Sequence, residues 1–536
     1  MFKLTLLQYK MWLFAFLVLI LIPDFVHGQN EKNKPAERNI EIDFANVKGK
    51  LNTFFKECVG AGRANEGLRA DWQHQLSYAH TECGFKYIRM HGLLTDDMAV
   101  YREDKDGNPQ YNFMYVDVLF DYLNKIGMKP FVELGFMPSG LASGNQTIFW
   151  WRGNVTPPKN YEKWKALVSK LVEHFTERYG VEEVKTWYFE VWNEPNLNGF
   201  WAGTQEEYFK LYKFSAEAVK GINPLYRVGG PGTAGAAWEK ELIDYCVDNK
   251  VPIDFISTHT YGVKQGYLDE FGNSGTVLSK DSMAVSGDVI QSRKEIQDSK
   301  KPNLELHYTE WSASYTPADP IHDSYHEASY VLQKLKEANN AAQSMSYWVF
   351  TDIFEEAGPR FTPFHGGFGL LTTQGINKPV FYAYKFLNQL GPVELLNKDF
   401  ASHACKDSNG NVQVLLWNFT NTHPGDSVNN QQYYIRDLPA KSAGKVSIHL
   451  TNVPPGAYTI EVYRIGYGSN DPYTTYLKMG RPDQLSAEQV NQIKNQNNGS
   501  PFYKESVTIR DSKIFTHKLD LKENDVFFIK LNRKLK

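Results

Sequence analysis

Short apolar runs alternate with longer amphipathic segments between about residues 50 and 390. In segments such as 161–178 the apolar residues recur every three or four positions, which is the period of a helix. This alternation is typical of repeated βα units around a parallel sheet. Eight units over this length predict a (β/α)8 TIM barrel at residues 50–392, with a doubly wound open sheet as the alternative. The eight predicted strands are residues 52–59, 87–91, 130–134, 186–192, 227–230, 255–259, 304–310 and 346–350.

The pattern changes after about residue 395. Apolar and polar residues alternate there in short runs with no long helix between them, which predicts a C-terminal antiparallel β-sandwich domain at residues 393–536. Its predicted strands are residues 412–419, 445–450, 458–463, 506–509 and 525–531. Residues 39–44 alternate in the same way. We therefore expect residues 29–49 to hold a flexible leader and then a strand that joins the sandwich.

The first 28 residues resemble a signal peptide. Lys3 and Lys10 precede an apolar run at 11–22, and a small residue, Gly28, ends the segment. We expect the mature chain to begin near Gln29 and to be secreted or periplasmic, with no membrane attachment after cleavage.

Charge and cysteine content exclude several classes of function. The chain has 58 basic and 61 acidic residues, which leaves no basic surface suited to nucleic acid or to an anionic membrane. Aromatic residues make up 14%, a generous supply of flat rings on which neutral sugars stack. Four cysteines are too few for a disulfide scaffold and lack the close pairs of a zinc site, so at most one or two disulfides are expected: Cys58, Cys83, Cys246 and Cys405.

Two glutamates stand at the ends of aromatic strands. Glu194 lies in Trp-Asn-Glu-Pro-Asn, and neither packing nor a turn alone requires an amide, an acid and a proline at that place. Glu310 lies in Thr-Glu-Trp, three predicted strands further along. Strand ends meet at one face of a barrel, so we expect these two carboxyl groups to face each other across its mouth. We interpret Glu190 and Glu305 as surface or salt-bridge residues.

Two carboxyl groups of this kind suit the hydrolysis of an acetal. The reaction needs one carboxyl that stays protonated near neutral pH and one that stays ionised. A separation of roughly 5 to 5.5 Å gives retention of configuration, and roughly 6.5 to 9.5 Å gives inversion.

Histidines also fall at predicted strand ends. His91 ends the second strand and His259 the sixth, where Tyr261 follows. A single histidine in such a place is more often part of the core, but both of these should face the same pocket as the glutamates. A zinc site made of His91, His259 and a glutamate is disfavoured because no His-x-x-x-His spacing occurs. We expect no metal and no cofactor.

Several motifs together resemble glycoside hydrolase family 39, the family of β-xylosidases and α-L-iduronidases. They lie at residues 189–201, 309–312, 347–356, 363–370, 463–465 and 478–482, so the resemblance covers nearly all of the mature chain. It implies a retaining double displacement with Glu194 as the general acid and then base, and Glu310 as the nucleophile. It also implies that Asn193 binds the hydroxyl next to the attacked carbon.

The same resemblance implies a set of residues that shape the sugar subsite, with two aromatic rings as its walls. They are His91, His259, Tyr261, Asp352, Glu355 and Glu356, with Phe200 and Trp348 as the walls. The iduronidase branch carries a lysine where this chain has Tyr261. That difference argues against a uronic acid substrate, although Arg360 lies near enough in the sequence to keep it open.

We therefore expect a secreted, exo-acting retaining glycosidase that releases terminal neutral sugars, in the first place a β-xylosidase acting on xylo-oligosaccharides. The alternatives are a family 39 enzyme that releases arabinose, galactose or iduronate, an endo-acting cellulase or xylanase, and a non-catalytic homologue that binds glycans. The oligomeric state is left open.

Overall fold

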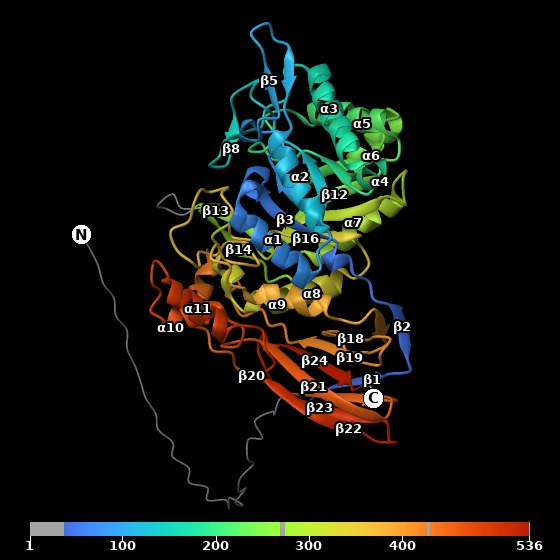
Figure 1. The fold of residues 1–536 in the computed structure, drawn as a ribbon, viewed down its shortest axis with the longest axis vertical. Coiled ribbons are helices and arrows are strands. Elements are labelled where there is room, and N and C mark those ends of the chain that lie inside the picture. Colours follow the sequence, from blue (N-terminus) through green and yellow to red (C-terminus); the bar gives the residue numbers. More distant parts are fainter. Residues whose placement is uncertain (1–36, 269–273, 426–428, 535–536) are drawn as a thin grey trace, which may run out of the picture.

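A computed structural model of the chain describes residues 37–268, 274–425 and 429–534. It shows a barrel and a β-sandwich, which lie one above the other in Figure 1. The predicted signal peptide, residues 1–28, lies outside the described residues. No helix in the described part is long and apolar enough to cross a membrane.

Eight parallel strands form a closed barrel, which confirms the predicted TIM barrel and excludes the open sheet. In order around the barrel they are β3 (Cys58–Arg63), β4 (Tyr87–His91), β7 (Lys129–Leu134), β10 (Tyr188–Val191), β11 (Arg227–Thr233), β12 (Phe255–Tyr261), β15 (Glu305–Ser312) and β16 (Ser344–Tyr347). A helix follows each strand: α1 (Ala70–Cys83), α2 (Met114–Ile126), α3 (Tyr161–Tyr179), α5 (Gln205–Ile222), α6 (Glu239–Asp248), α7 (Ser286–Asp298), α8 (His326–Ala338) and α9 (Pro379–Asn388).

The first predicted strand is misplaced. Residues 52–57 are not a strand, because Asn52 accepts a hydrogen bond from the Phe54 N–H and starts the short 3-10 helix η1 (Phe54–Lys56). The phenylalanines of η1 are buried, which explains the apolar run in the sequence. β3 begins only at Cys58. The last barrel strand also differs, since it covers Ser344–Tyr347 rather than residues 346–350.

The C-terminal domain contains two sheets. The larger one is antiparallel, in the order β2 (Val47–Lys50), β17 (Val393–Leu395), β18 (Ser402–Lys406), β19 (Val412–Trp417), β24 (Val526–Arg533), β21 (Gly456–Ile465) and β22 (Tyr503–Ile509). The smaller one contains β1 (Arg38–Asp43), β20 (Ser442–Thr451) and β23 (Phe515–Lys522). β1 pairs with β20 in parallel, so the N-terminal segment does add a strand and the domain is not wholly antiparallel.

Two helices interrupt the sandwich where none was expected. α10 (Pro472–Lys478) and α11 (Ala487–Gln496) lie between β21 and β22. The start of α11 has a capping box, in which Ser486 and Gln489 bond each other's backbone N–H, a signal that was present in the sequence. Both helices pack on the loop that follows β16, through a cluster of Phe364, Ile376, Tyr473, Tyr476 and Ile493.

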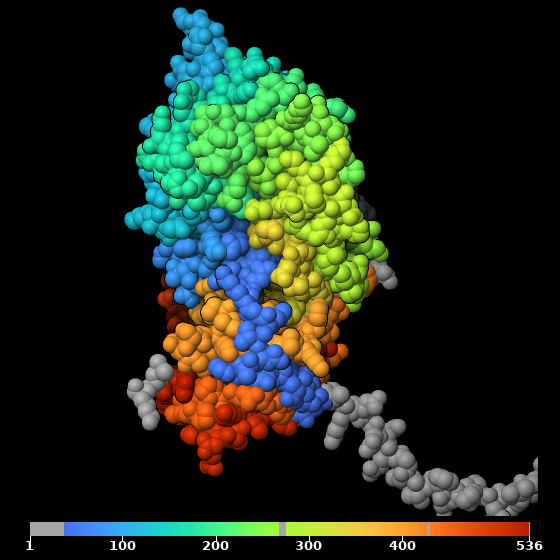
Figure 2. Space-filling view, turned by 90° about the vertical axis from the view of Figure 1, so that its right-hand side faces the viewer, coloured from blue at the N-terminus to red at the C-terminus, as the bar shows by residue number. Residues whose placement is uncertain are grey.

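The barrel rests on the sandwich through α8 and α9, which contact β19 and β21 (Figure 1). Phe386 of α9 is buried and stacks on Phe528 with ring centroids 5.1 Å apart. Figure 2 shows the N-terminal segment, in blue, running across the junction. Arg38 fixes this segment, because its guanidinium donates to Asp399 at 2.8 Å and to the Trp417 carbonyl at 2.7 Å.

All four cysteines are buried and have free thiols.

Phe386→Ala should destabilise the protein by about 3 to 5 kcal/mol, because it leaves a cavity at the junction of the two domains. Urea unfolding followed by tryptophan fluorescence measures this loss. Phe502→Ala is the control, since that ring is 56% exposed, and its midpoint should stay near that of the wild type. If both variants lost the same free energy of unfolding, the buried Phe386 ring at the junction would contribute no more than an exposed ring does.

Candidate active site

A cavity of about 790 Å³ opens at the end of the barrel where the strands have their carboxyl termini. Loops after β7, β10, β11, β12, β15 and β16 surround it. Eight of the eleven residues predicted for the site line this cavity: His91, Asn193, Glu194, Phe200, Tyr261, Glu310, Trp348 and Glu356. The structure therefore brings together most of a set that spans 266 positions of the sequence, from 91 to 356.

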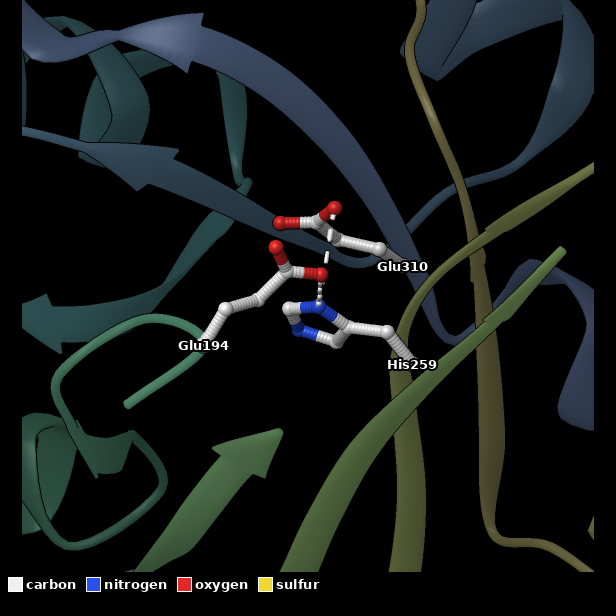
Figure 3. A group of neighbouring side chains, drawn as sticks. All are labelled: Glu194, His259 and Glu310. Atoms are coloured by element: carbon white, nitrogen blue, oxygen red, sulfur yellow. Dashed lines mark hydrogen bonds and ion pairs between the residues drawn. The ribbon is translucent and has the colours of Figure 1, made fainter. Parts of the chain in front are cut away.

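Glu194 and Glu310 face each other inside the cavity, with His259 beside them (Figure 3). One carboxylate oxygen of each glutamate and one ring nitrogen of His259 all lie within 4.8 Å of one another. This proximity of the two oxygens favours the close arrangement of retaining glycosidases, whose carboxyl groups are roughly 5 to 5.5 Å apart, over the roughly 6.5 to 9.5 Å of inverting ones.

A sharp turn at the end of β10 presents Glu194. The backbone of Trp192 and of Glu194 is left-handed, with φ of 72° and 46°, a conformation that is costly for residues other than glycine. Two backbone hydrogen bonds hold the turn: the Glu194 N–H donates to the Gly232 carbonyl at 2.7 Å, and the Leu197 N–H donates to the Glu194 carbonyl at 3.0 Å.

The surroundings of Glu194 favour its protonated form. Burial, and next the negative charge of Glu310, raise the pKa of Glu194 well above its ordinary value. His259 Nδ1 lies 2.9 Å from the Glu194 carboxyl. Burial, and next the charge of Arg89, lower the pKa of His259 well below its ordinary value, so the ring is neutral.

The hydrogen-bond network around His259 fixes where its proton lies. The Thr309 hydroxyl donates to Glu190 at 2.8 Å, so it accepts from His259 Nε2, which is 3.2 Å away. A neutral ring with its proton on Nε2 has a lone pair on Nδ1. His259 therefore accepts from Glu194, and that bond needs a proton on the Glu194 carboxyl. His259 itself does not line the cavity; it acts on the site through Glu194.

Two donors stabilise the anion of Glu310. Arg89 donates to one carboxylate oxygen at 2.8 Å, and the Tyr261 hydroxyl donates to the other at 2.7 Å. Burial raises the pKa of Glu310, but the Arg89 guanidinium, His91 and Tyr261 all oppose that rise. Among the described residues Glu194 has no such donors, so of the two carboxyl groups Glu194 is the better proton donor and Glu310 the better anion.

Arg89 of β4 is the functional residue that we did not select from the sequence. It is fully buried and also bonds Glu190 at 2.5 Å, Asn193 at 2.8 Å and Glu133 at 3.0 Å. An arginine inside an apolar strand was the available signal, because a buried guanidinium requires acidic partners. Glu190 is accordingly a salt-bridge residue, as interpreted.

His91 lies between Glu310 and a further acid of the cavity, Glu356. Its Nδ1 lies 2.6 Å from Glu133, and its Nε2 lies 3.5 Å from both Glu310 and Glu356. Burial, and next the charge of Glu310, raise the pKa of Glu356 well above its ordinary value. Glu356 therefore faces the cavity as a neutral carboxyl group that can donate a hydrogen bond.

Asp352 and Glu355, like His259, are not among the residues that line the cavity. Lys378 holds Asp352 at 2.7 Å beneath the loop that follows β16. Arg63 and Arg69 bind Glu355 of the same loop at 2.6 and 3.2 Å. In each case a cation from another segment, which the motif does not contain, turns the acid away from the sugar site.

Aromatic rings wall the inner part of the cavity. Trp348 and Phe149 flank His91, with ring centroids 4.8 and 5.9 Å away. Phe149 also packs edge-on against Phe200 at 5.4 Å. The two predicted walls, Phe200 and Trp348, are thus in place, and Phe149 adds a third ring.

Glu194, His259 and Glu310 are close enough to be considered as metal ligands. This set differs from the disfavoured one of the sequence analysis, because it includes both glutamates and lacks His91. Arg89 and Tyr261 already donate to the two oxygens of Glu310, so a metal ion at this place would have to displace them and would lie beside a guanidinium. We assign no step to a metal here.

The family model for glycosyl hydrolases family 39 matches residues 38–511. A beta-xylosidase from Caldicellulosiruptor saccharolyticus is 40% identical over 462 residues, which are 85% of this chain and 90% of that protein. The crystal structure of the GH39 enzyme from Xanthomonas axonopodis pv. citri has 41% identity and a TM-score of 0.91, over 95% of this chain and 100% of that one.

An alpha-L-iduronidase from Mus musculus is a more distant relative, 26% identical over 475 residues that cover 79% of this chain and 69% of that protein. The family match includes the barrel, with both cavity glutamates, and most of the sandwich. The chain therefore belongs to glycosyl hydrolases family 39 and is a glycoside hydrolase.

Proposed function

We propose that the protein is a secreted, exo-acting retaining β-xylosidase that removes terminal xylose from xylo-oligosaccharides. The observation that carries the proposal is a pair of buried carboxyl groups with one oxygen of each within 4.8 Å, of which Glu310 receives hydrogen bonds from Arg89 and Tyr261 while the pKa of Glu194 is raised well above its ordinary value. The beta-xylosidase that is 40% identical supports xylose as the sugar.

In the first step an oxygen of Glu310 attacks the anomeric carbon. The bond from that carbon to the glycosidic oxygen breaks, and Glu194 gives its proton to the departing oxygen. The sugar is then held as an ester of Glu310. In the ester Glu310 carries no negative charge. The pKa of Glu194, which that charge raised, therefore falls, and Glu194 stays a carboxylate.

In the second step Glu194 takes a proton from water, and the water oxygen attacks the same carbon. The ester bond breaks, Glu310 is again a carboxylate, and Glu194 again carries the proton. The His259 Nδ1 lone pair favours this return, because it faces Glu194 and can only accept. Two inversions at one carbon give retention of configuration.

A neutral sugar fits the cavity better than a uronic acid. A buried sugar carboxylate calls for a lysine or arginine partner, and the described residues that line the cavity include neither. Arg360 is half-buried, donates to the Pro317 carbonyl and is not part of the lining. The loops that surround the cavity on several sides suit the end of a chain, which supports exo action.

Secretion rests on the first 28 residues alone. N-terminal sequencing of the protein from the medium or periplasm should give a start near Gln29.

The substrate is tested with aryl glycosides of β-xylose, α-arabinose, β-galactose, β-glucose and α-iduronic acid. The β-xyloside should have the highest kcat/KM. If another glycoside had a higher kcat/KM, its sugar would replace xylose in the proposal. If none of the five glycosides were hydrolysed, a non-catalytic homologue that binds glycans would be favoured.

Glu310→Ala should lower kcat on the best of these substrates on the order of 10⁴-fold or more, because the nucleophile is lost. Added azide should restore turnover and give a glycosyl azide of inverted configuration, which NMR identifies. Glu305→Ala is the matched control: Glu305 begins the same strand, lies outside the cavity and should leave kcat nearly unchanged. An azide product of retained configuration would contradict the role of Glu310.

Glu194→Ala should affect substrates according to their leaving group. A dinitrophenyl xyloside needs little protonation, so its kcat/KM should fall less than about tenfold, whereas that of xylobiose should fall on the order of 10² to 10⁴-fold. Steady-state kinetics on the two substrates measures the difference. Equal losses on both would rule out an acid role.

The pKa of Glu194 should fall when Glu310 loses its charge, because the negative charge of Glu310 raises it in the wild type. Titration of 13C-labelled glutamate by NMR, in the wild type and in Glu310→Gln, measures this change. The wild type should also lose activity on the alkaline side as Glu194 ionises. An unchanged or higher pKa in Glu310→Gln would show that the two carboxyl groups are not coupled.

A further inference from the structure

A hairpin outside the barrel forms part of the cavity wall. β13 (Val263–Leu268) follows directly on β12 and pairs antiparallel with β14 (Ser274–Leu278) (Figure 1). Val263 lines the cavity, and the residue opposite it in the hairpin is Leu278, which is only 2% exposed. Because the two strands pair in this register, the place of Val263 at the cavity depends on what holds Leu278.

A side chain of the sandwich domain binds the backbone of Leu278. Asn430 begins the 3-10 helix η5 (Asn430–Ile435), which lies between β19 and β20. The Asn430 Oδ1 accepts from the Leu278 N–H at 2.8 Å, and its Nδ2 donates to the Leu278 carbonyl at 3.0 Å. The amide thus makes both bonds that a residue of a neighbouring antiparallel strand would make. Asn430 is also only 2% exposed, so water cannot easily replace these bonds.

The next residue, Gln431, is linked to a second part of the wall. Its Nε2 donates to the Thr276 hydroxyl of β14 at 3.2 Å. The hydroxyls of Thr276 and Ser314 both donate to the buried carboxylate of Asp319. These bonds tie β14 to the loop that follows β15, and this loop lines the cavity through Tyr315.

We propose that Asn430 and Gln431 are positioning residues for substrate binding: from the sandwich domain they hold the part of the cavity wall that Val263 and Tyr315 form. This inference rests on the proposed function, in which the cavity binds the sugar.

The reacting carboxyl groups have other anchors. Arg89 donates to Glu310, and backbone bonds hold the turn that presents Glu194. Loss of the Asn430 amide should therefore weaken the binding of the sugar and leave the chemical step nearly unchanged.

The test compares Asn430→Ala with the wild type. The constants kcat and KM are measured on the aryl glycoside that the wild type hydrolyses best, and the inhibition constant of the corresponding free sugar gives its affinity. Both KM and the inhibition constant should rise about 3- to 10-fold, the effect of one lost hydrogen bond, while kcat stays within about twofold. Gln432→Ala is the control, because this neighbouring side chain is exposed, and it should change neither constant.

A second set of variants tests the link between Gln431 and Thr276, and it serves if Asn430→Ala fails to fold. Thr276→Val keeps the shape of the side chain but removes the hydroxyl between Gln431 and Asp319, so KM and the inhibition constant should rise by a similar factor. Gln431→Leu should have the same effect. Thr276→Ser keeps the hydroxyl and should restore the wild-type values.

The release of the hairpin is measured separately by hydrogen–deuterium exchange with mass spectrometry. Peptides that contain Leu278 should exchange faster in Asn430→Ala than in the wild type or Gln432→Ala, because the Leu278 N–H has lost its acceptor. Unchanged exchange would show that Asn430 does not hold β14.

The kinetic outcomes separate this inference from the proposed function. If KM and the inhibition constant are unchanged in Asn430→Ala and Thr276→Val, or if kcat alone falls, the two sandwich residues do not position the substrate and the proposed function stands. If the wild type hydrolyses none of the glycosides, the proposed function fails and the inference fails with it.

Discussion

The site depends on one buried cation. Arg89 lies inside the barrel and is bound by side chains from three strands or their ends: Glu133 of β7, Glu190 and Asn193 at the end of β10, and Glu310 of β15. A buried guanidinium is tolerated only where its partners are held in good geometry. The same bonds that satisfy Arg89 therefore place Glu310, the proposed nucleophile, and Asn193, which precedes the proposed acid Glu194.

The charge balance around Arg89 also explains the state of the acid. Three carboxylates share this one guanidinium, so a further negative charge nearby is disfavoured. Glu194 and Glu356, which also line the cavity, both have a raised pKa, and burial and the charge of Glu310 are the two largest causes in each. The raised pKa of Glu194 is thus a property of the whole cluster, and in the proposed mechanism the loss of the Glu310 charge in the ester lowers that pKa and lets Glu194 act as a base.

The sequence predicted those features that lie within one continuous segment. Periodicity predicted the barrel, and the residues around Glu194 indicated the proposed acid. Arg89 was missed because Glu190 and Glu310 are 101 and 221 positions away from it. The ion pairs of Asp352 and Glu355 could not be predicted for the same reason, since their partners Lys378, Arg63 and Arg69 lie in other segments. The helix α11 was missed although its capping box was local, because the regular alternation of the strands around it dominated the interpretation.

The sandwich is connected to the site through the loop that follows β16. That loop carries Glu356 into the cavity, and besides the ion pairs of Glu355 with Arg63 and Arg69 it has contacts in both domains. Lys378 binds Asp352 and Asp323 at 2.7 Å each inside the barrel. Further along, Phe364 and Ile376 pack against Tyr473, Tyr476 and Ile493 of the sandwich helices. The loop is therefore anchored on both domains, on the barrel next to Glu356 and on the sandwich helices further along the chain.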